Sequence, residues 1–144
     1  MSHRASLLAL SIGIAAGIFG CSTYTNVTSV QIISKIAGDS QVAIAGTVLP
    51  VRPGVQVTDS LGVPVTGVSV DFSVTSGGGT IGGATGQATA VTGADGIAIA
   101  GDWKIGSVPG TNDLTAAVSN ASVHFVATGI VETTTHSDAP KIRQ

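Results

Sequence analysis

The sequence is short of cysteine, of aromatic residues and of charge. Among its 144 residues it has one cysteine, three phenylalanines, one tryptophan and one tyrosine, and only 10% are charged. A single cysteine excludes an intramolecular disulfide, so an exported fold would have to hold by packing alone. The formal net charge is −2 and no basic stripe exists, which argues against nucleic acid as a partner.

Side chains that carry out catalysis are scarce as well. Glu132 is the only glutamate and stands near the C-terminal end, so the facing carboxylates that a glycosidase needs are not available. His124 is the one candidate base in the middle of the chain, but its neighbours Val123 and Phe125 predict that it points to solvent, with no group to orient it. We therefore predict that the protein is not an enzyme and uses no cofactor.

The sequence gives little indication of metal binding. Four aspartates near expected turns could offer carboxylates to calcium from neighbouring loops, although turn propensity alone also explains them: Asp59, Asp95, Asp102 and Asp113. Calcium binding stays open on the sequence, and no metal ligand is assigned.

What the sequence does have is an apolar segment at its start. Arg4 precedes an apolar run from Ala5 to Phe19. The run is about fifteen residues long, whereas a membrane-spanning helix needs roughly 20. We predict a cleaved signal peptide over residues 1–20.

The run ends in Ile18-Phe19-Gly20-Cys21, which resembles the lipobox of bacterial lipoproteins. The resemblance implies that the Cys21 thiol carries diacylglycerol, that the leader is cut before Cys21, and that the new amino terminus receives an acyl chain such as palmitate. Two or three chains give stable membrane attachment. Ser22 stands where an inner-membrane retention signal would place Asp, so we expect the outer membrane if the bacterium has two. An ordinary secretory signal, cleaved without lipid, is the alternative.

Composition divides the remainder into three parts. Residues 21–29 are expected to be the lipidated cysteine and a linker, residues 30–129 one domain, and residues 130–144 a disordered tail. Within the domain, short Val-, Ile- and Thr-rich segments alternate with turn residues and no helical period is present. We expect strands over Val30 to Ile36, Gln41 to Ala45, Val55 to Asp59, Val65 to Val74, Thr89 to Val91, Ile97 to Ile105, Leu114 to Val118 and Val123 to Thr128.

About eight short strands in a hundred residues predict an all-β fold, a single antiparallel β-sandwich. Its inner face is clearest at Val68, Val70, Phe72 and Val74, which alternate with polar residues. Five segments also follow the pattern of bacterial Ig-like domains of group 1, the repeats of the invasin and intimin adhesins: Val55 to Phe72, Thr75 to Thr80, Thr92 to Ala98, Trp103 to Gly106 and Gly110 to Ala116. This resemblance covers about residues 34–129 and implies an Ig-like sandwich displayed outside the cytoplasm.

Two features of the domain are candidate binding sites. Ser76 to Gln87 is expected to be the longest irregular loop, and its residues Gly77, Gly78, Gly79 and Thr80 are the candidate ligand site. The segment from Gly77 to Gly82 fits G-x-G-x-x-G, but no helix follows to meet a pyrophosphate, so we do not predict nucleotide binding. Trp103 could stack on a sugar, yet a core position between the sheets is favoured, with the strand interrupted near Gly101 and Asp102.

These observations predict a lipid-anchored Ig-like module of the cell envelope with a structural, adhesive or protein-binding role. Family members are usually stalk or adhesion modules, and one copy in this chain leads us not to expect a long stalk. A glycan-binding surface module, which would need an exposed aromatic, is one alternative. An accessory subunit of an envelope complex is the other.

Overall fold

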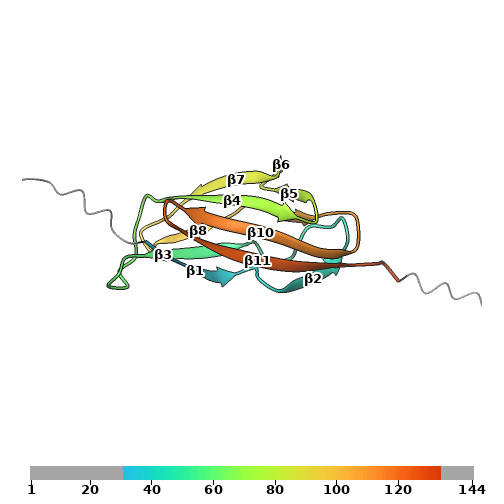
Figure 1. The fold of residues 1–144 in the computed structure, drawn as a ribbon, viewed down its shortest axis with the longest axis horizontal. Coiled ribbons are helices and arrows are strands. Elements are labelled where there is room, and N and C mark those ends of the chain that lie inside the picture. Colours follow the sequence, from blue (N-terminus) through green and yellow to red (C-terminus); the bar gives the residue numbers. More distant parts are fainter. Residues whose placement is uncertain (1–30, 134–144) are drawn as a thin grey trace, which may run out of the picture.

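The structure, a computed structural model, describes residues 31–133 and is built from β strands joined by turns (Figure 1). No helix occurs in these residues, and so none that is long and apolar enough to cross a membrane. The strands are β1 (Ile32–Ala37), β2 (Gln41–Ile44), β3 (Gly54–Thr58), β4 (Ser69–Ser76), β5 (Gly79–Ile81), β6 (Ala84–Thr85), β7 (Gln87–Val91), β8 (Ile97–Ile99), β9 (Trp103–Ile105), β10 (Gly110–Val118) and β11 (Ala121–Ile130). The predicted all-β class is confirmed.

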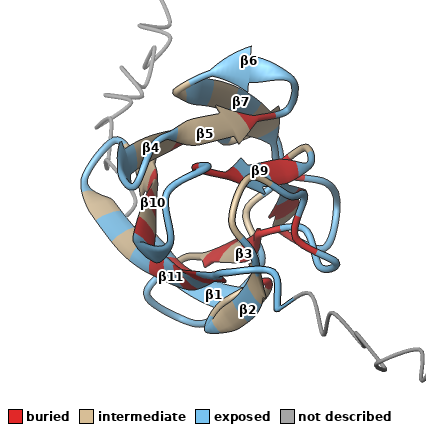
Figure 2. Cartoon of the chain, turned by 90° about the vertical axis from the view of Figure 1, so that its right-hand side faces the viewer, coloured by how far each residue is buried: buried red, intermediate tan, exposed pale blue. Residues whose placement is uncertain are grey.

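These strands form three sheets arranged as two layers around one core. The largest sheet has the order β2-β11-β10-β4-β7, and the smaller sheets have the orders β1-β3-β8 and β6-β5-β9. Figure 2 shows β4, β10 and β11 on one side of the interior and β3 and β9 on the other. Neighbouring strands are antiparallel except β11 and β2, which run parallel. The predicted antiparallel sandwich is therefore confirmed, with one parallel pair.

The core contains every aromatic side chain of the described residues. Phe72 on β4, Trp103 on β9 and Phe125 on β11 have no exposed surface. Val70 is buried beside Phe72. Each such side chain stabilises the fold by about 1.5–3 kcal/mol on burial. The alternation read from the sequence and the core position of Trp103 are both confirmed.

The segment from Ile97 to Ile105, expected to be one strand, is two strands in different sheets. β8 pairs with β3, whereas β9 pairs with β5. The corner between them needs Gly101, because a Cβ there would collide with the backbone of Gly82. Gly82 also donates its N–H to the Asp102 carbonyl, 3.0 Å away. The predicted interruption near Gly101 is confirmed, and it moves the chain from one sheet to another.

The segment from Ser76 to Gln87, expected to be an irregular loop, contains the hairpin of β5 and β6. Both turn residues, Gly82 and Gly83, have positive φ, of 60° and 80°. A tight two-residue hairpin requires such angles, and glycine adopts them without strain. Ile81 of β5 is fully buried and lies opposite Trp103. The loop prediction is wrong because these two short strands complete a sheet with β9.

The described chain begins and finishes at opposite ends of the long axis of the molecule (Figure 1). Near the N-terminal end the domain starts with β1, and at the other end β11 runs to Ile130, one residue into the range assigned to the tail. The predictions for residues 1–30, Cys21 among them, and for residues 134–144 lie outside the described residues.

Candidate functional site

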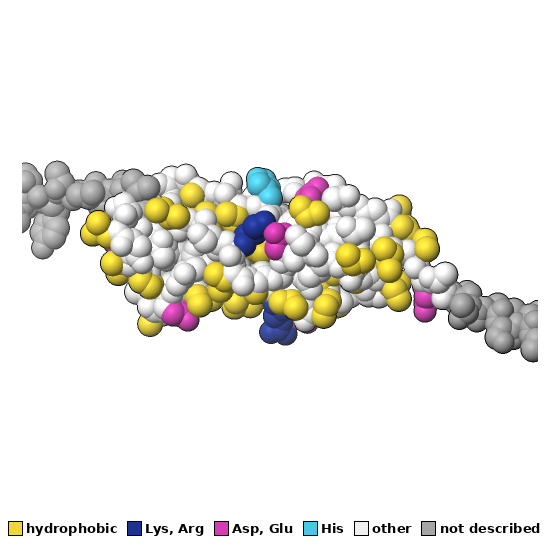
Figure 3. All heavy atoms as spheres, turned by 90° about the horizontal axis from the view of Figure 1, so that it is seen from below, with side chains coloured by type: hydrophobic (Ala, Val, Ile, Leu, Met, Phe, Trp, Pro, Cys, Tyr) yellow, Lys and Arg dark blue, Asp and Glu magenta, His cyan; other side chains and the backbone are white. Residues whose placement is uncertain are grey.

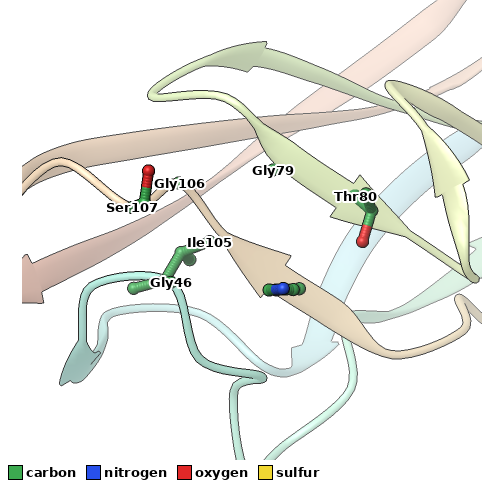
Figure 4. Close-up of a pocket in the computed structure, with 7 residues that line it drawn as sticks. Gly46, Gly79, Thr80, Ile105, Gly106 and Ser107 are labelled. Carbon is green, nitrogen blue, oxygen red and sulfur yellow. The ribbon is translucent and has the colours of Figure 1, made fainter.

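Two of the four predicted ligand residues, Gly79 and Thr80, line an open groove of about 380 Å³ (Figure 4). Gly77 and Gly78 lie just before β5 and do not line it. The full set of lining residues is Gly46, Gly79, Thr80, Lys104, Ile105, Gly106 and Ser107. The groove therefore joins three segments that are distant in the sequence.

Backbone pairing fixes the walls of the groove. β9 pairs with β5 on one side, with Gly79 opposite Ile105 and Thr80 opposite Lys104. On its other side the Ile105 N–H donates to the Thr47 carbonyl at 3.1 Å, and the segment continues as a bridge from Val48 to Lys104. Hydrogen bonds on both edges of β9 make this a preformed surface rather than a free loop.

A buried asparagine that the sequence analysis missed holds one end of the groove. Asn112 on β10 has no exposed surface, and its Oδ1 accepts the Gly106 N–H at 2.9 Å. Its Nδ2 donates to the Gly110 carbonyl at 3.1 Å. A Cβ on Gly77 would collide with the Asn112 side chain, and one on Gly106 would collide with the Gly77 carbonyl. The signal in the sequence was an amide at an inward position of an alternating strand.

The chemistry of the groove suits binding. Lys104 supplies the charge among the described residues that line it, and neither of the two ion pairs found in residues 31–133 involves its ammonium group. Thr80 and Ser107 add hydroxyl groups. Because the lining holds no carboxylate, imidazole or thiol, the groove could attract an acidic group but contains no acid–base pair.

His124 is exposed, as predicted, and its Nδ1 lies 2.9 Å from the Thr115 hydroxyl. A hydroxyl beside an imidazole is part of a nucleophilic site, which also needs a group to orient the ring and donors for an oxyanion. Among the hydrogen bonds of the described residues, none links the His124 ring to a carboxylate. The pair joins two residues that lie opposite each other on β10 and β11.

Three of the four candidate calcium ligands already bond to other groups of the protein. Asp59 accepts N–H bonds from Leu61 and Val63, and Asp95 accepts one from Ile97. Asp102 pairs with Arg52, and Asp113 lies within β10 rather than in a turn. Within residues 31–133 no three His, Cys, Asp or Glu residues gather closely enough to hold a metal ion. Asp59 and Asp95 therefore follow their turn propensity, whereas the prediction of a turn at Asp113 is wrong.

Lys35 on β1 forms an ion pair with Asp39 in the turn between β1 and β2. Figure 3 shows side chains of opposite charge beside each other on the face seen from below. Lys35 donates to the Asp39 carboxylate and to the His124 carbonyl, the latter at 2.9 Å. Asp39 Oδ1 accepts the Val126 N–H at 2.9 Å. Burial alone would raise the pKa of Asp39, but the hydrogen bonds from Lys35 and Val126 outweigh it and hold that pKa below its ordinary value.

No protein-family model and no curated protein sequence matches the chain. Among solved structures it is similar to the D00-D0 domain of intimin, with a TM-score of 0.55 and 20% sequence identity. The similarity covers 75% of this chain and 51% of that one, so the chain spans about half the length of the structure it matches. At this identity the likeness concerns the fold, and with the observed sheets it shows that residues 31–133 form an Ig-like β-sandwich.

Proposed function

We propose that this chain is a lipid-anchored module of the bacterial cell envelope with a structural, adhesive or protein-binding role and no catalysis. The Ig-like sandwich, similar to a domain of intimin, is the observation that carries the proposal. The two ends of the described chain lie at opposite ends of this sandwich, an arrangement suited to holding neighbouring segments apart (Figure 1).

The anchor is proposed from the sequence Ile18-Phe19-Gly20-Cys21. Lipid on Cys21 would attach the domain to a membrane, the outer one in a bacterium with two. A linker from residue 22 to residue 29 would then separate the lipid from the sandwich. The anchor would leave the groove and the sheet edges free for partners.

Mass spectrometry of the processed amino terminus, together with detergent partitioning, tests this proposal. We expect an N-terminal peptide that begins at Cys21 and carries the added mass of diacylglycerol and an acyl chain, in a protein that enters the detergent phase. A Cys21→Ser variant should lose the lipid and stay uncut before residue 21. An unmodified Cys21 in a protein from the aqueous phase would contradict the anchor.

The groove around Lys104 is the described surface best suited to an acidic ligand within this role. Its one cation, two hydroxyl groups and rigid backbone would hold a carboxylate of a partner protein. The glycan-binding alternative has no comparable support. It requires an exposed aromatic, and the aromatic side chains of residues 31–133, which are Phe72, Trp103 and Phe125, are all buried.

A further inference from the structure

At one edge of the large sheet, side chains cap the part of β11 that β2 does not cover. Along β11, residues 127–130 pair with β2, and beyond β2 the Val126 N–H and the His124 carbonyl are capped by Asp39 and Lys35. Free backbone groups at a sheet edge invite pairing with another chain, and charged side chains are a common protection. The part of β11 that β2 leaves uncovered is therefore protected.

Other exposed edges carry protection of a different kind. β1 holds Lys35 and a register shift between Lys35 and Ala37. The Gln41 side chain at the start of β2 is tied to Val51 by two hydrogen bonds, of 2.8 Å and 3.0 Å. β6 and β8 are only two and three residues long. Charge, a bulge and short length each disfavour strand addition.

The opposite edge of the large sheet, strand β7, has none of these protections. β7 is five residues long and ends the sheet order beyond β4 (Figure 1). The Val74 N–H donates to the Gly86 carbonyl, and the Thr92 N–H donates to the Val68 carbonyl. These two bonds determine which residues of β7 direct their backbone groups toward β4. By alternation Ala88 and Ala90 bond to β4, whereas the N–H and C=O groups of the odd-numbered residues face outward.

The outward-bonding residues are Gln87, Thr89 and Val91, and no hydrogen bond in residues 31–133 uses their backbone groups on that side. Their side chains are exposed. The sequence from Phe72 to Ala94 contains no charged residue that would repel an approaching strand. β7 is therefore an uncharged and uncapped edge of sufficient length for pairing.

We propose that β7 pairs with β7 of a second copy of this chain, antiparallel and centred on Thr89. The edge is self-complementary about this residue. A two-fold axis there places Thr89 opposite Thr89 and Gln87 opposite Val91, so every outward-facing N–H and C=O of both strands gains a partner. Thr–Thr pairs across strands are favourable, and no like charges meet.

The two five-stranded sheets then become one continuous sheet across two molecules. A single strand pair is a small interface, below the roughly 1,200 Å² typical of stable complexes, so the dimer should dissociate on dilution. Attachment of both copies to one surface would raise their effective concentration. The pairing needs no lipid and goes beyond the proposed function, so its failure would leave the anchor untouched.

Sedimentation equilibrium tests the pairing on the chain as the cell exports it, solubilised in mild detergent, over about 10 µM to 1 mM. The Thr89 hydroxyl donates to Asp71 of its own chain at 2.7 Å. We expect a monomer–dimer equilibrium that Thr89→Lys weakens, because the substitution removes this bond and places two lysine side chains opposite each other on the axis. Thr128→Lys, the same change at an exposed position of β11, is the matched control and should leave association unchanged. Trp103 fluorescence reports that both variants stay folded.

Amide hydrogen exchange supplies a second measurement. The amides of residues 87, 89 and 91 should gain protection as the concentration rises, and Thr89→Lys should abolish that gain. A chain that stays monomeric throughout the range overturns the proposal. So does a dimer that both lysine variants weaken equally, or one in which these three amides remain unprotected.

Discussion

Asp39 connects the turn between β1 and β2 to strand β11 through one carboxylate, which receives bonds from Lys35 and from the Val126 N–H. Its pKa is lowered in the folded protein. The stabilisation from the carboxylate is therefore complete above the unfolded pKa of about 4 and is lost as the pH falls through the lower folded pKa. The same bonds that close an edge thus make stability sensitive to acid.

We expect Asp39→Asn to lower the free energy of unfolding by about 1 kcal/mol at pH 7 and to reduce the further loss below about pH 4. Urea denaturation at both pH values measures this. Asp102→Asn, which removes a carboxylate from the exposed pair with Arg52, is the control and should change stability by less than about 0.5 kcal/mol. Equal effects of the two substitutions would contradict the role given to Asp39.

Asn112 contributes to stability because its side-chain amide is buried and hydrogen-bonded. Asn112→Ala would leave the Gly106 N–H without its acceptor and the Gly110 carbonyl without its donor. An unpaired buried polar group costs about 1–3 kcal/mol, so we expect a loss in that range by denaturant unfolding. Thr111→Ala, at the exposed neighbouring position, should cost less than about 0.5 kcal/mol. A loss of unfolding free energy no larger than that of Thr111→Ala would show that the hydrogen bonds of Asn112 add little to stability.

At the scale of elements, periodicity predicted the longer strands and failed where pairing partners decide the structure. β4 and β11 alternate strongly enough for their inner faces to be read from Phe72 and Phe125. β5 has only Thr80 and Ile81 between runs of glycine, and it becomes a strand because β9 lies beside it. A local pattern cannot show such a partner. The division of Ile97 to Ile105 between two sheets was hidden for the same reason.

The candidate groove, too, could be predicted from the sequence only in part. Glycine content pointed to the segment that holds Gly79 and Thr80, but Gly46 and Lys104 reach the groove through long-range pairing. Asn112 could have been suspected only as a polar residue at an inward position. The sequence therefore indicated one wall of the groove and could not indicate the others.

The corner between β8 and β9 depends on close backbone approach. Gly101→Ala places a methyl group against the backbone of Gly82, and neither backbone can move without disturbing β5 or β9. We expect a loss of about 1–3 kcal/mol by thermal or denaturant unfolding. Gly93→Ala, whose added Cβ would meet the exposed Asp95 carboxylate first, is the control and should lose less. Equal losses would show that the corner has room to adjust.

At the scale of the whole molecule, a domain with a single cysteine has no covalent bond between its strands, so the packed sheets alone resist unfolding. The described chain enters beside β1 and leaves after β11, at opposite ends (Figure 1). β2 follows β1 closely in the sequence and pairs in parallel with the last four residues of β11.

This parallel pair determines how the domain responds to tension. Pulling the two ends apart draws β2 and β11 in opposite directions along their length, so their hydrogen bonds are loaded together instead of opening one by one. We expect stretching of single molecules to show one high-force rupture, lowered by Ala43→Pro, because the register places the Ala43 N–H toward β11 and proline removes that donor. Ala90→Pro removes one ladder bond between β7 and β4, away from this pair, and should leave the rupture force unchanged. A fall as large as that for Ala43→Pro would contradict the assignment. A domain built this way would keep its two ends connected under tension without any cross-link.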